Sequence, residues 1–144
     1  MKRTISFMTG KGSVNHNSRK FHAKNTDPER SCLNVEYCNE NVKDVYHELF
    51  DEALERYNAK QKRSNRKIDN YYEKIRQSKQ EKLFHEVILQ IGNKDDMNSK
   101  SKEGELAKEI LIDYMQDFQK RNPNLYVFSA HLHMDEETPH IHID

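Results

Sequence analysis

Four of the eight histidines and four carboxylates of the chain lie within the fourteen residues from His131 to Asp144. In a β-strand, side chains two residues apart point to the same face, so His140 and His142 would lie side by side. A hairpin that returns through Pro139 would bring His133 of the preceding strand next to them. The spacing therefore predicts three imidazoles that converge on one point.

Three imidazole ligands are typical of a catalytic metal site, because they leave coordination positions open for water or substrate oxygens. Imidazole nitrogens bind transition metals more tightly than Mg²⁺, while supply and geometry decide which ion is bound in a cell. We expect a divalent ion, with Mn²⁺ preferred and Mg²⁺ or Zn²⁺ as alternatives. The opposing interpretation is a surface hairpin whose histidines face water, and a His-x-His pair opposite a third histidine disfavours it.

Carboxylates lie at the turn between the two predicted strands. Asp135 and Glu136 would lie beside the histidines, where a carboxylate can orient a ligand imidazole, join the metal shell or act as a base. Glu136 is the preferred candidate for these roles. Glu137 and Asp144 are expected to be solvated or to cap a strand.

Apolar periodicity predicts the elements that must hold these side chains in place. Strands are predicted over residues 3–8, 32–37, 83–91, 125–134 and 140–143. Helices are predicted over residues 13–21, 41–75 and 103–118. Together they indicate one α+β domain over residues 1–144, with an antiparallel sheet of about four to five strands and helices packed on one face.

The net charge of zero hides an uneven distribution of charge. Residues 56–82 hold ten lysines and arginines against three acids, a net charge of +7, and the rest of the chain carries −7. We expect this segment to form a basic helix that projects from the core. It fits a polyanion such as DNA, although a solvated helix face is the commoner explanation of a single charge run. The candidate DNA contacts are Arg63, Arg66 and Lys67.

Composition excludes several classes of protein. Hydrophobic residues make up 34% of the chain and charged residues 33%, so we expect a thin core. No apolar run is long enough for a membrane span, and the N-terminus lacks the apolar centre of an export signal. Two cysteines without such a signal favour reduced thiols and a cytoplasmic location.

Motifs in three parts of the chain resemble a known family. His140-Ile141-His142 resembles the His-hydrophobic-His signature of the HUH endonucleases. The ten residues from His133 to His142 closely resemble the mobilisation and plasmid-recombination (Mob/Pre, MobV-type) relaxases. Two further stretches are similar to that family, namely residues 15–21 followed by 27–34, and residues 57–68, so the resemblance spans nearly the whole chain.

The resemblance implies site- and strand-specific DNA nicking and strand transfer at an origin of transfer, through a covalent link between the protein and the 5′ phosphate. The DNA would be single-stranded or a hairpin. His16 is the implied nucleophile, Arg19 would bind phosphate, and Glu136 would support the nucleophile or the metal. The implied metal ligands are His133, His140 and His142.

Other residues compete for the role of the nucleophile. His22 is also N-terminal, but it lacks the Asn-x-Arg setting of His16 and is expected to lie in a loop. Tyr71, with Lys74 three positions later, imitates the Tyr-x-x-Lys of replication initiators. It precedes the histidine pair instead of following it, so helix packing is the preferred interpretation.

Two other functions stay open from the sequence. A non-catalytic DNA-binding or regulatory module would use the basic helix for contact and the histidines for a structural ion. An iron oxygenase is the weaker alternative, in which His133-Met-Asp135 would supply half of a facial triad. Because the last strand is barely begun at Asp144, we also expect a C-terminal truncation whose exposed sheet edge invites a homodimer.

Overall fold

The structure is a computed structural model that describes residues 3–144. It contains two compact units, which are described separately. The sheet unit comprises the residues up to Asn39 together with His85–Asp144, and the helical unit comprises Glu40–Phe84. Within residues 3–144, none of the helices combines the length and the apolar character that crossing a bilayer requires.

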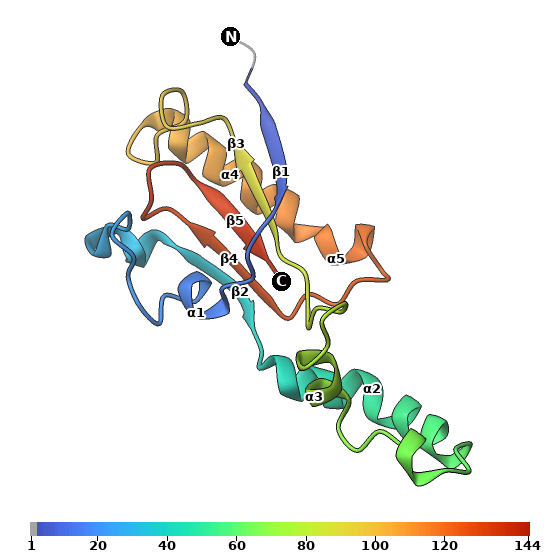
Figure 1. The fold of residues 1–144 in the computed structure, drawn as a ribbon. Coiled ribbons are helices and arrows are strands. Elements are labelled where there is room, and N and C mark those ends of the chain that lie inside the picture. The colour runs from blue at the N-terminus through green and yellow to red at the C-terminus, as the bar shows by residue number, and fades with distance from the viewer. Residues whose placement is uncertain (1–2) are drawn as a thin grey trace. The chain divides into compact units, whose positions relative to one another are not determined.

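The sheet unit is built on five antiparallel strands (Figure 1). Their order across the sheet is β1-β3-β5-β4-β2. The strands are β1 Ile5–Thr9, β2 Val35–Asn39, β3 Val87–Ile91, β4 Ser129–His133 and β5 His140–Ile143. The antiparallel α+β sheet predicted from the sequence is confirmed.

The predicted hairpin between the last two strands is also confirmed. In the β4–β5 pairing, His133 lies opposite His140, and His131 lies opposite His142. Residues directly opposite each other in an antiparallel pair share a face of the sheet. All four histidines therefore lie on one face, which we call the histidine face.

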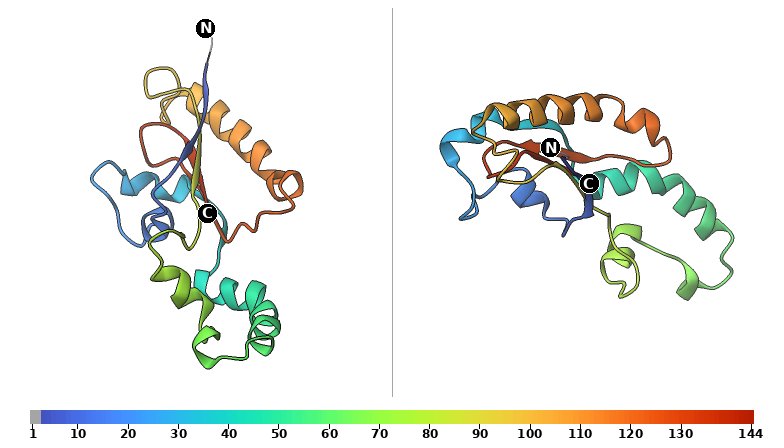
Figure 2. Two further views of the ribbon diagram at one scale, coloured as in Figure 1. Left: turned by 45° about the vertical axis from the view of Figure 1, so that its right-hand side comes forward. Right: turned by 90° about the horizontal axis from the view of Figure 1, so that it is seen from above.

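The opposite face of the sheet carries the core. The long helix α4 Lys102–Gln116 packs against β3, β4 and β5 on this face, and α5 Phe118–Arg121 continues it (Figure 2). Ser101 caps α4 by accepting a hydrogen bond from the Gly104 amide. The buried side chains that meet between helix and sheet include Leu89, Ile91, Ala107, Leu111, Leu132 and Ile141.

A short helix, α1 Val14–Asn17, lies on the histidine face (Figure 2). The sequence predicted a longer helix, over residues 13–21, and this prediction is wrong. Arg19 adopts a φ of 54°, a left-handed conformation that an α-helix cannot continue through. The predicted strand over residues 32–37 begins late, at Val35, because a 3₁₀ helix occupies Pro28–Leu33.

In the helical unit, the single helix predicted to run from Asn41 to Ile75 is interrupted. Helix α2 spans Val42–Ala59, a 3₁₀ turn follows at Ser64–Arg66, and α3 spans Tyr71–Arg76. The Asn58 side chain bonds both the amide and the carbonyl of Ile68, which fixes the reversal of the chain. The prediction of a basic helix over residues 56–82 is therefore wrong. The hydrogen bonds from the Asn58 side chain to Ile68, ten residues later, compete with the backbone hydrogen bonds that would continue the helix.

Candidate metal centre and active site

Three buried histidines of the β4–β5 hairpin converge on the histidine face. One ring nitrogen from each of His133, His140 and His142 lies within 4.8 Å of the others. The strand register causes this convergence, because His133 and His140 are direct partners and His142 is two residues further along the same face. The structure thus brings together the three metal ligands expected from the sequence.

Each ring is held by an acceptor on its other nitrogen. His133 Nε2 donates to the Asn17 carbonyl at 2.8 Å, and His140 Nδ1 donates to the Thr138 carbonyl at 2.8 Å. His142 Nδ1 donates to Glu86 Oε1 at 2.7 Å. Since a carbonyl or carboxylate oxygen can only accept, these contacts fix the tautomer of each neutral ring.

The remaining nitrogens suit a cation. His133 Nδ1 and His142 Nε2 are buried and have no hydrogen-bond partner. An unpaired buried polar atom costs about 1–3 kcal/mol, so such atoms usually have a function. Oriented rings whose second nitrogen bonds an oxygen acceptor are the usual surroundings of metal-binding histidines. The donor set therefore fits a divalent transition-metal ion.

His133 and His140 are also neutral, as ligands must be. Burial, followed by the effect of the neighbouring His140, lowers the pKa of His133 to about 2. Burial, followed by the effect of His142, also lowers the pKa of His140. Both rings thus offer a lone pair at physiological pH.

Glu86 is a functional candidate that the sequence analysis did not identify. Its carboxylate accepts hydrogen bonds from His142, from the Gly12 amide at 2.8 Å and from the Asn17 side chain at 2.5 Å. Burial alone would raise the pKa of Glu86, but these hydrogen bonds lower it to about 2. A Cβ atom at Gly10 would lie 1.8 Å from Glu86 Oε2, so only glycine leaves room for this carboxylate.

Asp144 differs from its expected role. It was expected to be solvated or to cap a strand, yet it is 6% exposed and accepts a hydrogen bond from the Asn17 side chain at 3.2 Å. Burial and the nearby Glu86 raise the pKa of Asp144 to about 6. Glu137, in contrast, is exposed as expected.

His16 lies beside the three-histidine cluster. Helix α1 places its ring centroid 6.2 Å from that of His133 and 6.3 Å from that of His142. Its side chain is 22% exposed, so a substrate can reach it. Burial, followed by the positive charge of Arg19, lowers the pKa of His16, whereas Glu136 opposes this effect.

Glu136 joins His16 to the cluster. Glu136 Oε1 lies 3.6 Å from His16 Nε2, 3.8 Å from His133 Nδ1 and 3.9 Å from His140 Nε2. Of the two carboxylates at the turn, it is the one in reach of both the candidate nucleophile and the candidate ligands. This position is compatible with either role expected for it, in the metal shell or next to the nucleophile.

Arg19 is paired with carboxylates in this structure. Its guanidinium donates to Asp135 at 2.9 and 2.5 Å and to Glu136 at 2.8 Å. Asp135 also accepts from Ser31 and Asn34, and these bonds, against the opposing effect of burial, lower the pKa of its carboxyl well below the usual range. Arg19 thus anchors the turn that carries Glu136, and its expected contact with phosphate stays a prediction.

The expected DNA contacts belong to the helical unit. Arg63, Arg66 and Lys67 are all exposed at or next to the 3₁₀ turn. Their role stays a prediction. Of the rival nucleophiles, His22 lies exposed in a loop, and Tyr71 packs against Tyr46 and Phe50, which agrees with a structural role.

Comparisons with known proteins identify the family of this chain. A family model for plasmid recombination enzymes (Mob_Pre) matches residues 7–144. The chain belongs to this family. The resemblance to Mob/Pre proteins, expected from motifs in the sequence, is confirmed, whereas a search of curated protein sequences found no match.

Solved structures of a Mob/Pre protein share the fold. Two structures of the MobM relaxase domain (MOBV; Mob_Pre), both Mn-bound and in complex with oriT DNA of plasmid pMV158, are similar to this chain. One is 24% identical with a TM-score of 0.52, and the other is 21% identical with a TM-score of 0.53. In both cases the alignment covers 99% of this chain and 69% of the other.

Proposed function

We propose that this Mob/Pre chain is a metal-dependent relaxase. It nicks one DNA strand at a specific site in an origin of transfer, single-stranded or in a hairpin, and keeps the 5′ phosphate as a covalent link for strand transfer. The observation that carries the proposal is the position of His16, an accessible histidine with a lowered pKa next to three oriented imidazoles. The Mn-bound, oriT-bound MobM domains of the same fold support it.

The chain's own residues prepare His16 for attack. Arg19 Nη1 lies 3.4 Å from His16 Nε2, and because arginine can only donate, Nε2 carries the lone pair in this arrangement. In the proposed step, this lone pair forms a bond to phosphorus while the bond from phosphorus to the 3′ oxygen breaks. Positive charge that develops on the ring is then close to the Glu136 carboxylate, 3.6 Å away.

A divalent ion, with Mn²⁺ preferred, would be held by His133, His140 and His142. When bound, it supplies polarisation of the scissile phosphate and neutralises the negative charge that develops on it. Asn17, Thr138 and Glu86 orient the three rings for this purpose through the hydrogen bonds described above. Mg²⁺ and Zn²⁺ are the alternatives.

The test is a nicking assay with supercoiled plasmid that carries an origin of transfer, in the presence of Mn²⁺. We expect nicked circles with protein on the 5′ end, and we expect His16→Ala to abolish them because no nucleophile replaces it. The phosphorus–nitrogen bond of the link hydrolyses in acid, which distinguishes it from a tyrosyl ester. His22→Ala is the matched control and should nick normally, because His22 lies in an exposed loop.

One result would favour the non-catalytic DNA-binding module instead. In that case the protein would bind origin DNA without nicking it, and His16→Ala would bind equally well. An acid-stable covalent complex would point to a tyrosine nucleophile.

A further inference from the structure

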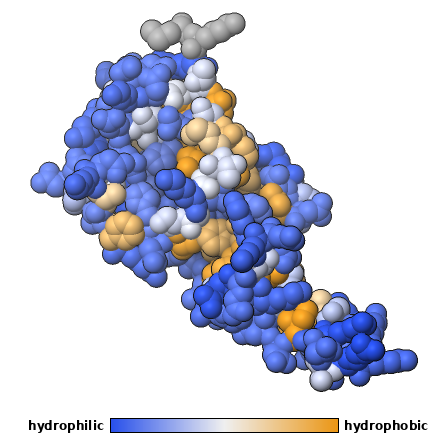
Figure 3. Space-filling view, viewed as in Figure 1, coloured by the Kyte–Doolittle hydropathy of each residue, from blue (hydrophilic) through white to orange (hydrophobic). Residues whose placement is uncertain are grey.

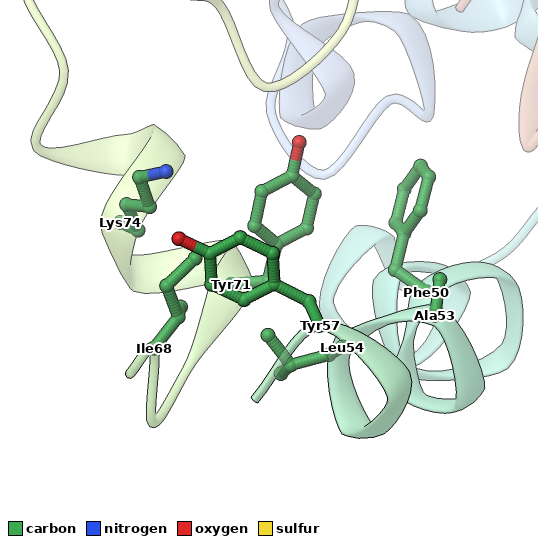
Figure 4. Close-up of a pocket in the computed structure, with 7 residues that line it drawn as sticks. All are labelled: Phe50, Ala53, Leu54, Tyr57, Ile68, Tyr71 and Lys74. Carbon is green, nitrogen blue, oxygen red and sulfur yellow. The ribbon is translucent and has the colours of Figure 1, made fainter. Parts of the chain in front are cut away.

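The helical unit contains an open cavity that the proposed chemistry does not use. Its volume is about 310 Å³, which lies in the range of small-molecule sites. Helix α2 contributes one wall, and α3 with the preceding loop contributes the other (Figure 4). The main lining residues are Phe50, Leu54, Tyr57, Ile68, Tyr71 and Lys74.

Aromatic rings dominate this cavity. Figure 4 shows the tyrosine and phenylalanine rings of α2 and α3 around a common space, with the amine of Lys74 on the α3 side. Tyr57 is 44% exposed, so part of this residue is accessible from solvent. Figure 3 shows small hydrophobic patches within a mostly hydrophilic surface. An exposed aromatic ring of this kind can act as a stacking surface.

The walls are fixed before any ligand arrives. Phe50 and Tyr71 pack edge to face with ring centroids 5.2 Å apart. The two hydrogen bonds between the Asn58 side chain and the Ile68 backbone hold the loop wall against α2. A pre-formed cavity binds with a smaller loss of conformational entropy than one that must be ordered.

The charge around the cavity favours an anionic ligand. From Arg56 to Ile68 inclusive, the chain has six lysines and arginines and no acid. Lys74 lies at the rim, with its amine 6.0 Å from the centre of the Tyr71 ring. A neighbouring hollow contains Asp51 and Asp69, but it has a volume of only about 20 Å³, roughly enough for one water molecule.

We propose that this cavity binds one unpaired nucleobase of single-stranded DNA, stacked on Tyr57, with its phosphate near Lys74. Every base has a π-face, so an aromatic ring beside a cation holds single-stranded DNA without regard to sequence. The inference rests on the proposed function, because a relaxase must hold unpaired DNA near the nick. It assigns part of that binding to the helical unit.

The experiment measures the affinity of the full chain for a fluorescein-labelled, unstructured 20-nucleotide DNA by fluorescence anisotropy at fixed salt. We expect Tyr57→Leu to weaken binding roughly tenfold, because leucine keeps apolar bulk but removes the stacking ring. Tyr57→Phe, which keeps the ring, is the matched control and should bind like the parent protein. Lys74→Ala should weaken binding and lower the slope of affinity against salt concentration by about one.

A second probe separates stacking from charge. An oligonucleotide of the same length with abasic sites should bind the parent protein more weakly, and Tyr57→Leu should bind this probe as the parent protein does. The chain contains no tryptophan, so Tyr57→Trp introduces a single reporter whose fluorescence should be quenched by the normal oligonucleotide. If Tyr57→Leu binds both probes like the parent protein, or if the tryptophan fluorescence is unchanged, the cavity has another occupant and the inference is wrong.

The two proposals fail in different ways. If the protein never nicks plasmid but Tyr57→Leu weakens its binding to single-stranded DNA, the relaxase proposal is wrong and the proposal for the cavity stands. If the protein nicks plasmid normally and Tyr57→Leu leaves its affinity for single-stranded DNA unchanged, the proposal for the cavity is wrong and the relaxase proposal stands.

Discussion

On one face of the central sheet, Leu132 and Ile141 are fully buried beneath α4. On the other face, their neighbours in the same strands, His133 and His140, are buried almost as completely, at 0% and 8% exposure. Burial by itself therefore does not distinguish core from site. The difference lies in the atoms that burial leaves without a partner. On the histidine face these are ring nitrogens of His133 and His142, whereas under α4 the packing is mainly apolar and the Tyr37 hydroxyl is the polar exception among the described residues.

The two faces of the sheet make opposite contributions to stability. Packing under α4 stabilises the strands by roughly 1.5–3 kcal/mol for each buried aliphatic side chain. That stabilisation offsets the cost of burying the unpaired nitrogens of His133 and His142 one residue away along the strands. Substitutions on the histidine face should consequently lower activity more than stability, and substitutions on the α4 face should lower stability more than activity.

The largest effect is expected on the histidine face. His140→Ala removes one of the three candidate ligands, and nicking should fall roughly 1000-fold or more, about 4 kcal/mol, because charge on the scissile phosphate is no longer neutralised. The free energy of unfolding without metal should change by only about 1 kcal/mol, through the lost hydrogen bond to the Thr138 carbonyl. Plasmid nicking and urea unfolding measure the two quantities.

His131 provides the matched control for this substitution. It is buried on the same face and in the same hairpin, yet its ring is outside the three-histidine cluster. His131→Ala should keep most of the nicking activity. If His131→Ala and His140→Ala lost activity equally, the effect would not depend on membership of the three-histidine cluster. The proposal that this cluster holds the metal would then lose its support.

A core substitution should show the reverse pattern. Leu111 of α4 is fully buried, and Leu111→Ala should lower the free energy of unfolding by about 3 kcal/mol through lost burial and the cavity left behind. The fraction that stays folded should nick at the normal rate. Leu106 on the same helix is 44% exposed, so Leu106→Ala should change stability by no more than about 0.5 kcal/mol. A large loss of nicking per folded molecule would mean that the two faces are coupled.

The features that the sequence predicts well are local in the chain. Alternation places His140 and His142 on one face, Pro139 marks the turn, and helical periodicity marks the buried side of α4. Each of these patterns is complete within about fifteen residues, so neighbouring side chains suffice to determine it.

The features that were missed depend on contacts between distant segments. Glu86 meets His142 only because β3 pairs with β5, a partnership across 56 residues that no local pattern reveals. The end of α2 at Ala59 coincides with the two hydrogen bonds between the Asn58 side chain and the backbone of Ile68, ten residues further along the chain. A polar residue at the start of an apolar strand, as Glu86 is, is the one signal in the sequence that points to a buried acceptor.

Glu86 gives the smallest and most specific test of the histidine face. Glu86→Gln keeps the shape of the side chain but removes the charge, and its amide would place a donor near the Gly12 or Asn17 donors. Because this carboxylate orients His142, affinity for Mn²⁺ should fall about 10- to 100-fold. Isothermal titration with Mn²⁺ measures the change directly, without relying on activity.

Glu137→Gln removes the same charge from the same neighbourhood and serves as the control. Glu137 is exposed on the hairpin turn, so Mn²⁺ affinity should be unchanged. If both variants lost affinity equally, the long-range negative charge of the turn would explain the effect. Loss in Glu86→Gln alone would show that the hydrogen bond to His142 orients the ring, and that the histidine face depends on a residue from a strand distant in sequence.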